Sequence, residues 1–370
     1  MRKLKYDYVV GTGGIGSGIL FRFSDNITLG RNESRLAELM DVRDFCKLHI
    51  ILHYVITYLN KSIPVYAIGR VGDDVSGREV LGLMEQYGIN CRYVNVDSHE
   101  KTMYSVCFVY PDSDGGNITT SNSASGNMRE EDIAAFFEQE QLKGRGLVLA
   151  APEVPLDIRL YLLKKGRENS CFNVASFTSD EMGECISSGA FQYVDLLAIN
   201  KHEMETLVTA GGVEAESGAP ECYGFLRSQN PGIQLIVTQG GEGAQFFANG
   251  YSERIPAIWK PVNSTAGAGD CFLATVISGL ICGVPFYEHD SSVGLGGLAA
   301  LASSLKVTCK DTIDFTLDRE RLKEEAARLG IDFSDKIKKL FFIHGPVKVP
   351  GTCSRTFFLY FPIVNNSHIW

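Results

Sequence analysis

The chain has 370 residues, 45% of them hydrophobic and 21% charged, which is the balance of a globular protein with ample material for a core. Its formal net charge of −9 argues against nucleic acid as the main partner, because no basic surplus exists to neutralise a phosphate backbone. No signal-length apolar segment follows the basic start and no stretch is long enough to span a bilayer, so we expect a cytoplasmic protein with no membrane partner.

The ten cysteines are scattered without a C-x-x-C pair, and several lie inside apolar runs. This pattern predicts buried, reduced thiols and gives no metal or redox spacing. His49 and His53 have the i, i+4 spacing of a metal pair, but no adjoining Glu or third ligand accompanies them. We therefore expect two ordinary histidines on a helix.

The first third of the chain predicts strands and helices in alternation, with turns of a small sheet outside the main body. A strand through Tyr8–Val10 enters a Gly-rich turn at residues 11–18, and a β-like run follows at 19–26. Apolar residues at helical spacing predict a helix from about Glu33 to Leu59. Further predicted elements are a strand at 64–69, a helix through 81–84, and strands at 91–96 and 102–110.

After residue 128 the pattern becomes helix and apolar strand in alternation. Runs that are apolar on both faces and separated by helical patterns indicate a parallel sheet covered by helices on both sides. The predicted strands are 146–150, 171–174, 194–199 and 233–238.

The heptapeptide Ser264-Thr-Ala-Gly-Ala-Gly-Asp270 opens a long apolar segment, Cys271–Cys282, which predicts a buried helix. Its small residues leave backbone amides bare at the positive end of the helix dipole, which is an anion site suited to phosphate. A carboxylate there makes sense if Asp270 takes a proton from a hydroxyl that attacks phosphorus. The plainer alternative is a Gly/Ala-rich helix start with Asp270 as a dipole partner.

Two further motifs follow apolar strands. In a parallel sheet, ligands gather at the carboxyl ends of strands, so the Gly-rich run Thr238–Gly243 is a candidate phosphate-binding turn, or else a simple β-turn. Asn200 and Glu203 have the spacing of a capping box, which needs no function, but Glu203 would also project toward the same crevice.

Together with the turn Gly69–Gly77, these motifs resemble those of the ribokinase-like (PfkB) carbohydrate kinase family, in the family's order, over roughly residues 60–305. The resemblance implies a three-layer α/β sandwich with a mostly parallel central sheet and a small β-sheet lid. It implies a kinase domain over residues 1–310, with the lid drawn from about 11–35 and 90–126. We expect residues 311–370 to form a C-terminal helix and a basic, aromatic tail of unknown role.

The resemblance also implies roles for single residues. The function would be transfer of the γ-phosphoryl group of ATP to a hydroxyl of a sugar or sugar-like molecule, with ATP and Mg²⁺ as cofactors. In the expected site Asp270 is the general base, and the amides of Gly267, Ala268 and Gly269 form the anion hole. ATP would be bound by Asn200, Thr238, Gly240 and Gly243. Glu203 and Asn200 would hold the metal indirectly, through water or phosphate. A homodimer through the lid is a further expectation.

Departures from the family pattern concern the acceptor and a cation. The family usually carries an Asp at the end of the first strand and a Gly-Gly-x-x-x-Asn element, both of which grip the sugar. This chain has no carboxylate in the turn at 11–18, and its nearest second element contains Gly30, Arg31 and Asn32. Because Arg donates to anions and offers no acceptor to hydroxyls, one hypothesis is an anionic acceptor held by Arg31. The others are that Arg31 points to solvent, or that Asp25 restores a neutral-sugar site.

Ser264 stands where the family usually has an Asp that helps hold a monovalent cation. A neutral hydroxyl offers such a cation less charge, so we expect weak or absent activation by potassium.

Three alternatives stay open. A nucleoside kinase of the same fold would use the same machinery with another acceptor. The run Gly11–Gly16 fits G-x-G-x-x-G after a strand, which is typical of a nicotinamide-dependent oxidoreductase, although a β-like run follows it where a helix should start. A catalytically silent ligand-binding regulator is the third, but such a protein gains nothing from a base at Asp270.

Overall fold

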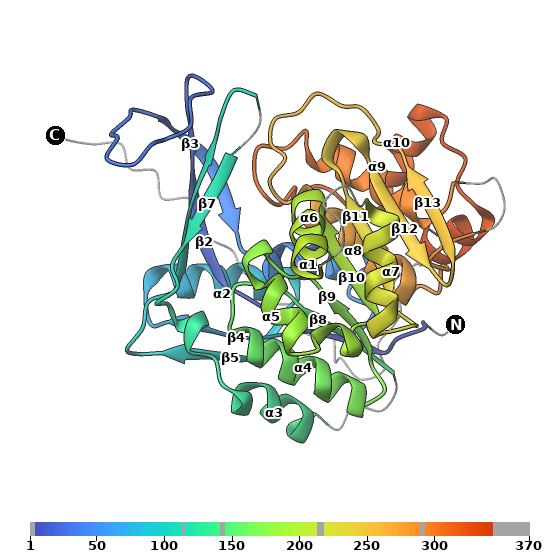
Figure 1. Ribbon diagram of the computed structural model, residues 1–370, viewed down its shortest axis with the longest axis horizontal. Coiled ribbons are helices and arrows are strands. Elements are labelled where there is room, and N and C mark those ends of the chain that lie inside the picture. The colour runs from blue at the N-terminus through green and yellow to red at the C-terminus, as the bar shows by residue number, and fades with distance from the viewer. Residues whose placement is uncertain (1–3, 113–114, 141–144, 213–217, 289–292, 343–370) are drawn as a thin grey trace, which may run out of the picture.

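The computed structural model describes residues 4–112, 115–140, 145–212, 218–288 and 293–342 (Figure 1). Its central sheet has nine strands in the order β13-β12-β11-β10-β9-β8-β1-β4-β5. All neighbours pair in parallel except β11 with β12 and β12 with β13, which are antiparallel. The strands are β1 Tyr8–Thr12, β4 Val65–Gly72, β5 Asn90–Asp97, β8 Gly146–Ala150, β9 Phe172–Ala175, β10 Leu196–Asn200, β11 Gln234–Thr238, β12 Ala244–Ala248 and β13 Tyr251–Ile255.

Helices cover both faces of this sheet and bury one apolar cluster on each side, as the continuous apolar strands predict. One face carries α1 Lys47–Tyr58, α2 Val75–Tyr87, α8 Ala268–Ile281, α9 Leu295–Lys306 and α10 Arg319–Leu329. The other carries α3 Glu130–Gln139, α4 Leu156–Glu168, α5 Met182–Ser187, α6 Lys201–Ala210 and α7 Ala219–Gln229. The predicted three-layer α/β architecture is confirmed.

A second sheet stands apart from the first on the left of Figure 1 and forms the lid. Its four strands have the order β3-β2-β6-β7. They are β2 Gly16–Arg22, β3 Glu38–Phe45, β6 Met103–Val109 and β7 Gly115–Thr119. Asp74, the N-cap of α2, ties the lid to the main body, because its carboxylate accepts hydrogen bonds from the backbone N–H and the hydroxyl of Thr102, just before β6.

The lid differs from the predicted one in two strands. The helix expected from about Glu33 is wrong in its first half, where residues 38–45 pair with β2 as β3 and the helix begins only at Lys47. The apolar residues at helical spacing lie within 48–59. Residues 38–45 are mostly exposed, and their side chains alternate in burial from one residue to the next, which is typical of a strand with one exposed face. Residues 90–97, assigned to the lid from sequence, instead form β5 at the edge of the main sheet.

The Gly-rich turn after β1 does not open a helix, which contradicts the dinucleotide-binding alternative. The chain passes from β1 into β2 of the lid. The space beside the glycines is filled by the protein, since a Cβ on Gly13 would lie 2.8 Å from the Cβ of Ala151, and one on Gly14 2.6 Å from that of Glu153. A pyrophosphate therefore has neither a helix N-terminus nor room at this turn.

The C-terminal segment up to residue 342 is part of the main body. Ile313, Leu322 and Phe341 belong to the same apolar cluster as α8 and α9. The aromatic run at 357–361 and the basic residues Lys348 and Arg355 lie outside the described residues.

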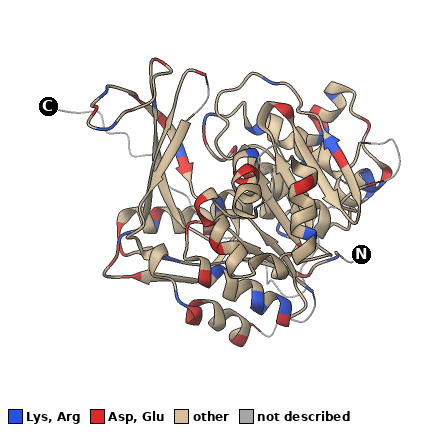
Figure 2. Ribbon diagram, viewed as in Figure 1, with Lys and Arg blue, Asp and Glu red and all other residues tan. Residues whose placement is uncertain are grey.

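Acidic and basic residues are spread over both sheets and the helices of the described ranges (Figure 2). The nine cysteines of the described ranges are free, and seven of them are buried, as predicted. No helix in these ranges is long and apolar enough to cross a membrane.

His49 and His53 are buried among aromatic rings with no hydrogen-bond partner for their ring nitrogens in the described structure. Burial lowers their pKa values to about 3 and about 4.

Candidate active site

Asp270 lies in the first turn of α8, whose residues from Cys271 to Ile281 are all buried. The N-cap of this helix, Gly267, has a left-handed φ of 76°, and a Cβ there would lie 2.3 Å from the carbonyl oxygen of Thr312. Only glycine tolerates both conditions, so the Gly-rich sequence is required by the way the loop enters the helix. The apolar helix fixes the position of the carboxylate at its N-terminus.

Two of the three predicted anion-hole amides are free of protein acceptors within the described residues. The N–H of Ala268 donates to the Thr265 carbonyl oxygen at 3.1 Å, and the N–H of Cys271 donates to that of Gly267 at 2.9 Å. The N–H groups of Gly267 and Gly269 have no such acceptor. They remain available to an anion at the positive end of the helix.

The half-buried Asp270 sits in a cluster of charges. Burial raises the pKa of the Asp270 carboxyl, Lys47 opposes that rise, and Glu203 adds to it. Lys47 is the first residue of α1, and although burial opposes its charge, Asp270 and Glu203 raise its pKa above the ordinary value. A carboxyl group whose affinity for a proton is raised by its surroundings is suited to act as a general base.

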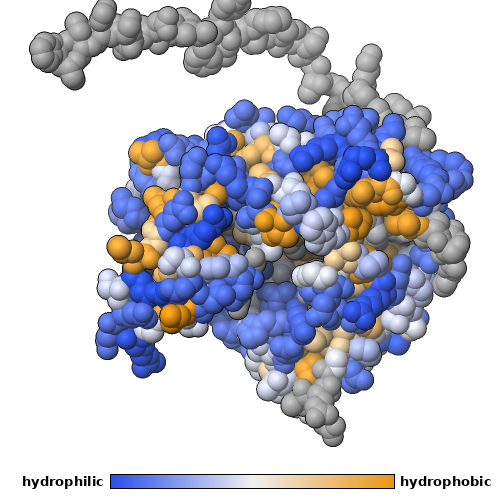
Figure 3. Space-filling view, turned by 90° about the horizontal axis from the view of Figure 1, so that it is seen from above, coloured by the Kyte–Doolittle hydropathy of each residue, from blue (hydrophilic) through white to orange (hydrophobic). Residues whose placement is uncertain are grey.

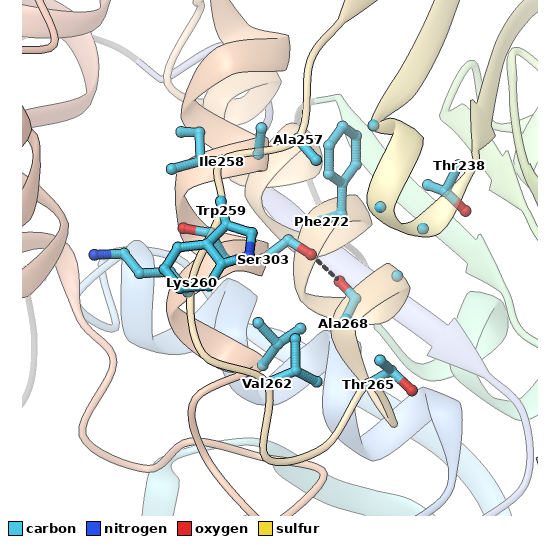
Figure 4. A pocket seen from close by; sticks show the side chains of 17 residues that line it. Thr238, Ala257, Ile258, Trp259, Lys260, Val262, Thr265, Ala268, Phe272 and Ser303 are labelled. Carbon is cyan, nitrogen blue, oxygen red and sulfur yellow. Dashed lines mark hydrogen bonds between the residues drawn. The ribbon is translucent and has the colours of Figure 1, made fainter. Parts of the chain in front are cut away.

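A cavity of roughly 360 Å³ joins the N-terminus of α8 to the turn after β11 (Figure 4). Thr238, Gly240 and Gly243 of that turn line it, as do Thr265 and Gly269 at the start of α8. The remaining wall is mostly apolar and is formed by side chains that include Ala257, Ile258, Trp259, Val262 and Phe272. The volume and the mixture of apolar wall and bare amides suit a small ligand with an anionic end.

Asn200 and Thr238 are paired neighbours at the carboxyl ends of β10 and β11. The Asn200 side chain accepts from the backbone N–H of Glu203 at 2.8 Å, and the Glu203 carboxylate accepts from that of Asn200 at 2.8 Å. The capping-box interpretation is thus confirmed. The second oxygen of Glu203 lies 3.8 Å from the ammonium of Lys47, so the same side chain also faces the Asp270 cluster.

No group of three or more His, Cys, Asp or Glu side chains able to hold a metal occurs in the part of the chain that the structure describes. Mg²⁺ needs no such group, because it commonly binds through one or two carboxylates, water and the phosphates of a nucleotide. The buried carboxylate of Glu203, which acts on the pKa of Asp270, fits that donor set.

The model of the pfkB family of carbohydrate kinases matches residues 55–319. The chain belongs to this family. Its members are phosphotransferases with a hydroxyl group as acceptor.

Ribokinases and a nucleoside kinase are among the known proteins that are similar to this chain. The ribokinase of Arabidopsis thaliana is 26% identical over 269 residues, which is 70% of this chain and 66% of that protein. The chain spans about two thirds of the length of the first such relatives. Two solved structures share the fold. The A. thaliana ribokinase with ribose and ATP has a TM-score of 0.65 at 19% identity, covering 86% of this chain and 98% of its own. The Burkholderia thailandensis nucleoside kinase with inosine has a TM-score of 0.69 at 17% identity, and the match covers 88% of this chain and 99% of its own.

The acceptor residues predicted from the pfkB pattern lie together on the lid, in the loop between β2 and β3. Gly30, Arg31 and Asn32 are exposed there. Asp25 pairs with Arg35 of the same loop at 2.5 Å, and this pairing lowers the pKa of Asp25. The structure does not bring this group to the Asp270 cluster through any contact among the described residues.

Sequence reasoning missed Glu153, which follows β8 and lies against Gly14. Its Oε2 is buried without a hydrogen-bond partner in the described structure. Its backbone has a left-handed φ of 75°, a strain that clusters at functional sites. Burial raises the pKa of Glu153 to about 7, with Lys47 opposing and Asp270 adding to the rise. The signal in the sequence was the run of glycines beside the first strand, which leaves room for a carboxylate from another element.

Proposed function

We propose that this chain transfers the γ-phosphoryl group of ATP to a hydroxyl group of a sugar or a nucleoside. The observation that carries the proposal is the position of the Asp270 carboxylate in the first turn of α8, next to bare amides and next to Gly269, which lines a cavity together with the Thr238–Gly243 turn. Family membership and the A. thaliana ribokinase structure with ribose and ATP support the choice of nucleotide.

In the proposed reaction Asp270 accepts the proton of the acceptor hydroxyl as its oxygen attacks the γ-phosphorus. The bond from that phosphorus to the bridging oxygen of the β-phosphate breaks, and ADP leaves with the electron pair. The amides of Gly267 and Gly269 donate to the oxygens of the phosphoryl group in transfer, where negative charge is spread. The raised pKa of Asp270 makes it a better base than an exposed carboxylate.

The cavity beside α8 would hold the nucleotide. Its apolar wall at Trp259, Val262 and Phe272 suits a base, and the glycine turn suits the phosphates. Glu203, with Asn200, would hold Mg²⁺ indirectly through water or phosphate. When bound, that ion neutralises phosphate charge.

The acceptor hydroxyls would face Glu153 and Asp44. Asp44, near the end of β3, is buried, and its carboxylate oxygen would lie 2.4 Å from a Cβ on Gly18. The glycines that replace the expected first-strand carboxylate therefore make room for carboxylates from the lid and from the loop after β8. Two such carboxylates favour a neutral polyhydroxyl acceptor, and the anionic acceptor held by Arg31 becomes the second hypothesis.

A panel of neutral sugars, acid sugars, sugar phosphates and nucleosides, assayed for ADP release, tests the function and the acceptor together. We expect turnover with a neutral sugar or nucleoside, a raised acceptor KM in Glu153→Gln, and an unchanged one in Arg31→Ala. If an acidic sugar is the best acceptor and only Arg31→Ala raises its KM, the acceptor assignment is wrong. The catalytically silent alternative requires nucleotide or sugar binding with no ADP release for any member of the panel.

We also propose a homodimer through the lid. Its strands and loop expose large apolar side chains, among them Ile27, Leu36, Leu39 and Ile118. The space-filling view in Figure 3 shows a hollow between the lid side and the main body, with apolar residues on both sides of it. Light scattering at several concentrations should give the mass of a dimer, and Leu39→Lys should give that of a monomer.

A further inference from the structure

Lys306 is the last residue of α9, and it is fully buried. Its ammonium donates to the carbonyl oxygen of Ser264 at 3.3 Å, and no carboxylate of the described residues pairs with it within 4.0 Å. A buried charge without a paired carboxylate is costly, so a chain retains one where the charge has a use. Burial lowers the pKa of the Lys306 ammonium, and the nearby carboxylates of Asp270 and Asp314 oppose that fall and favour its charged form. Asp44 is a further charged neighbour.

The end of α9 already holds the loop before α8 by neutral hydrogen bonds. The N–H groups of Asn263 and Ser264 donate to the Val307 carbonyl oxygen at 2.7 and 3.2 Å, and the Ser303 hydroxyl donates to that of Ala268 at 3.1 Å. These contacts fix the loop without any charge. The ammonium of Lys306 therefore contributes something that they do not, namely a positive charge at the carbonyl oxygen of Ser264, in the loop that leads to the bare amides.

Lys306 does not line the nucleotide cavity, although Ser303, Ser304 and Val307 around it do. It consequently acts through the Ser264 carbonyl and through the field at Asp270. In a site shielded from water, the electrostatic interaction between Lys306 and a nearby negative charge is stronger than it would be on the surface. It favours negative charge both on Asp270 and on a phosphoryl group at the Gly267 and Gly269 amides.

We propose that Lys306 is a tethered cation of the phosphoryl-transfer site: it positions the Ser264–Gly267 loop and supplies the positive charge behind the anion hole, so that no free monovalent cation is needed. This inference rests on the proposed kinase function. It gives a physical cause for the potassium independence that Ser264 predicts.

The test is the affinity for MgADP alone and for MgADP with aluminium fluoride, which stands in for the phosphoryl group in transfer. Wild type should show the same gain in affinity from aluminium fluoride in sodium, potassium and choline chloride. Lys306→Ala should lose about 10²-fold of that gain, a typical cost of a misplaced loop. Ammonium, methylammonium or potassium should restore part of it by entering the vacated space, while choline should not.

Lys306→Met separates charge from packing. Its side chain fills the space without a charge, so the gain should be lost and no cation should restore it. Lys323→Ala, which removes an exposed lysine of α10, is the control for general charge effects and should match wild type. Melting temperatures confirm that each variant is folded.

The inference is overturned if both Lys306 variants keep the wild-type gain, or if folded Lys306→Ala loses it and no small cation restores any part. A wild-type gain that requires potassium overturns it as well, and that measurement stands even if the variants fail to fold. If wild type binds no MgADP at all, the proposed function itself fails.

Discussion

The ammonium of Lys47 lies 3.8 Å from the carboxylate of Glu203, which joins the N-terminus of α1 to that of α6 beside Asp270. Helices far apart in the sequence thus begin at one point, the edge where the parallel strands end. At that edge, Lys47 and Glu203 have opposing effects on the pKa of Asp270, because the ammonium lowers it and the carboxylate raises it.

Glu203→Gln should raise the Mg²⁺ concentration needed for half-maximal activity. The amide can still accept the hydrogen bond from the Asn200 N–H, so the helix cap survives, while the negative charge that helps to attract the ion is lost. Glu205→Gln on the exposed face of the same helix is the matched control and should leave the metal titration unchanged. A lower melting temperature with an unaltered metal requirement would leave Glu203 as a helix cap only.

Gly267 and Gly269, whose amides would form the anion hole, should respond differently to substitution by alanine. Gly267→Ala meets the Thr312 carbonyl oxygen and a left-handed φ, so the free energy of unfolding should fall by about 1–2 kcal/mol or more. A Cβ on Gly269 meets nothing within 4 Å, so stability should hold, but the methyl group projects where phosphate would bind. Denaturant unfolding and MgADP titration measure the two effects. Equal loss of stability in both variants would contradict this geometry.

Glu153 should make stability depend on pH. Its pKa of about 7 lies above the ordinary value of 4.5, so between these values the folded state binds more protons than the unfolded state and the free energy of unfolding falls as pH rises. The effect is at most about 3 kcal/mol. His49 and His53 have lowered pKa values and act in the opposite direction, losing stability as pH falls below 6.5.

The difference in unfolding free energy between wild type and Glu153→Gln at pH 5, 6, 7 and 8 isolates the Glu153 contribution. Wild type should lose stability relative to the variant as pH rises to about 7 and then stay constant. A difference that is flat across this range would mean that the Glu153 carboxyl titrates normally.

Potassium should not activate the wild-type enzyme. Ser264 offers a cation only a hydroxyl and a carbonyl, and the carbonyl already accepts from Lys306. Initial rates in sodium, potassium and choline chloride at constant ionic strength should agree within error. A steep rise on exchanging sodium for potassium would contradict both the role of Ser264 and that of Lys306.

Local sequence predicted the parts of the fold in which one physical signal dominates. The apolar runs at 146–150 and 233–238 are β8 and β11, and the heptapeptide opens α8 as expected. Residues 38–45 were misassigned because the helical periodicity of the next twelve residues was extended backward across a strand whose partner, β2, is specified only by tertiary pairing.

The acceptor side of the site escaped prediction for a similar reason. Arg31 stood out because of its neighbours in the sequence, whereas Glu153 and Asp44 reach their glycines only in three dimensions. Lys306 carried no signal at all, since a lysine at a helix end is ordinary until its burial is known. Motifs that act through backbone geometry are readable from sequence, and side chains that converge from several elements are not.

The central claim is that Asp270 is the base of a phosphoryl transfer from ATP, and Asp270→Asn tests it most directly. The acceptor found in the panel assay is used to measure turnover, and titration measures MgATP binding, for wild type, Asp270→Asn and the exposed control Asp157→Asn. The account predicts that turnover falls by about 10²-fold or more in Asp270→Asn alone, with MgATP affinity roughly unchanged in all three proteins. Wild-type turnover in Asp270→Asn would contradict it.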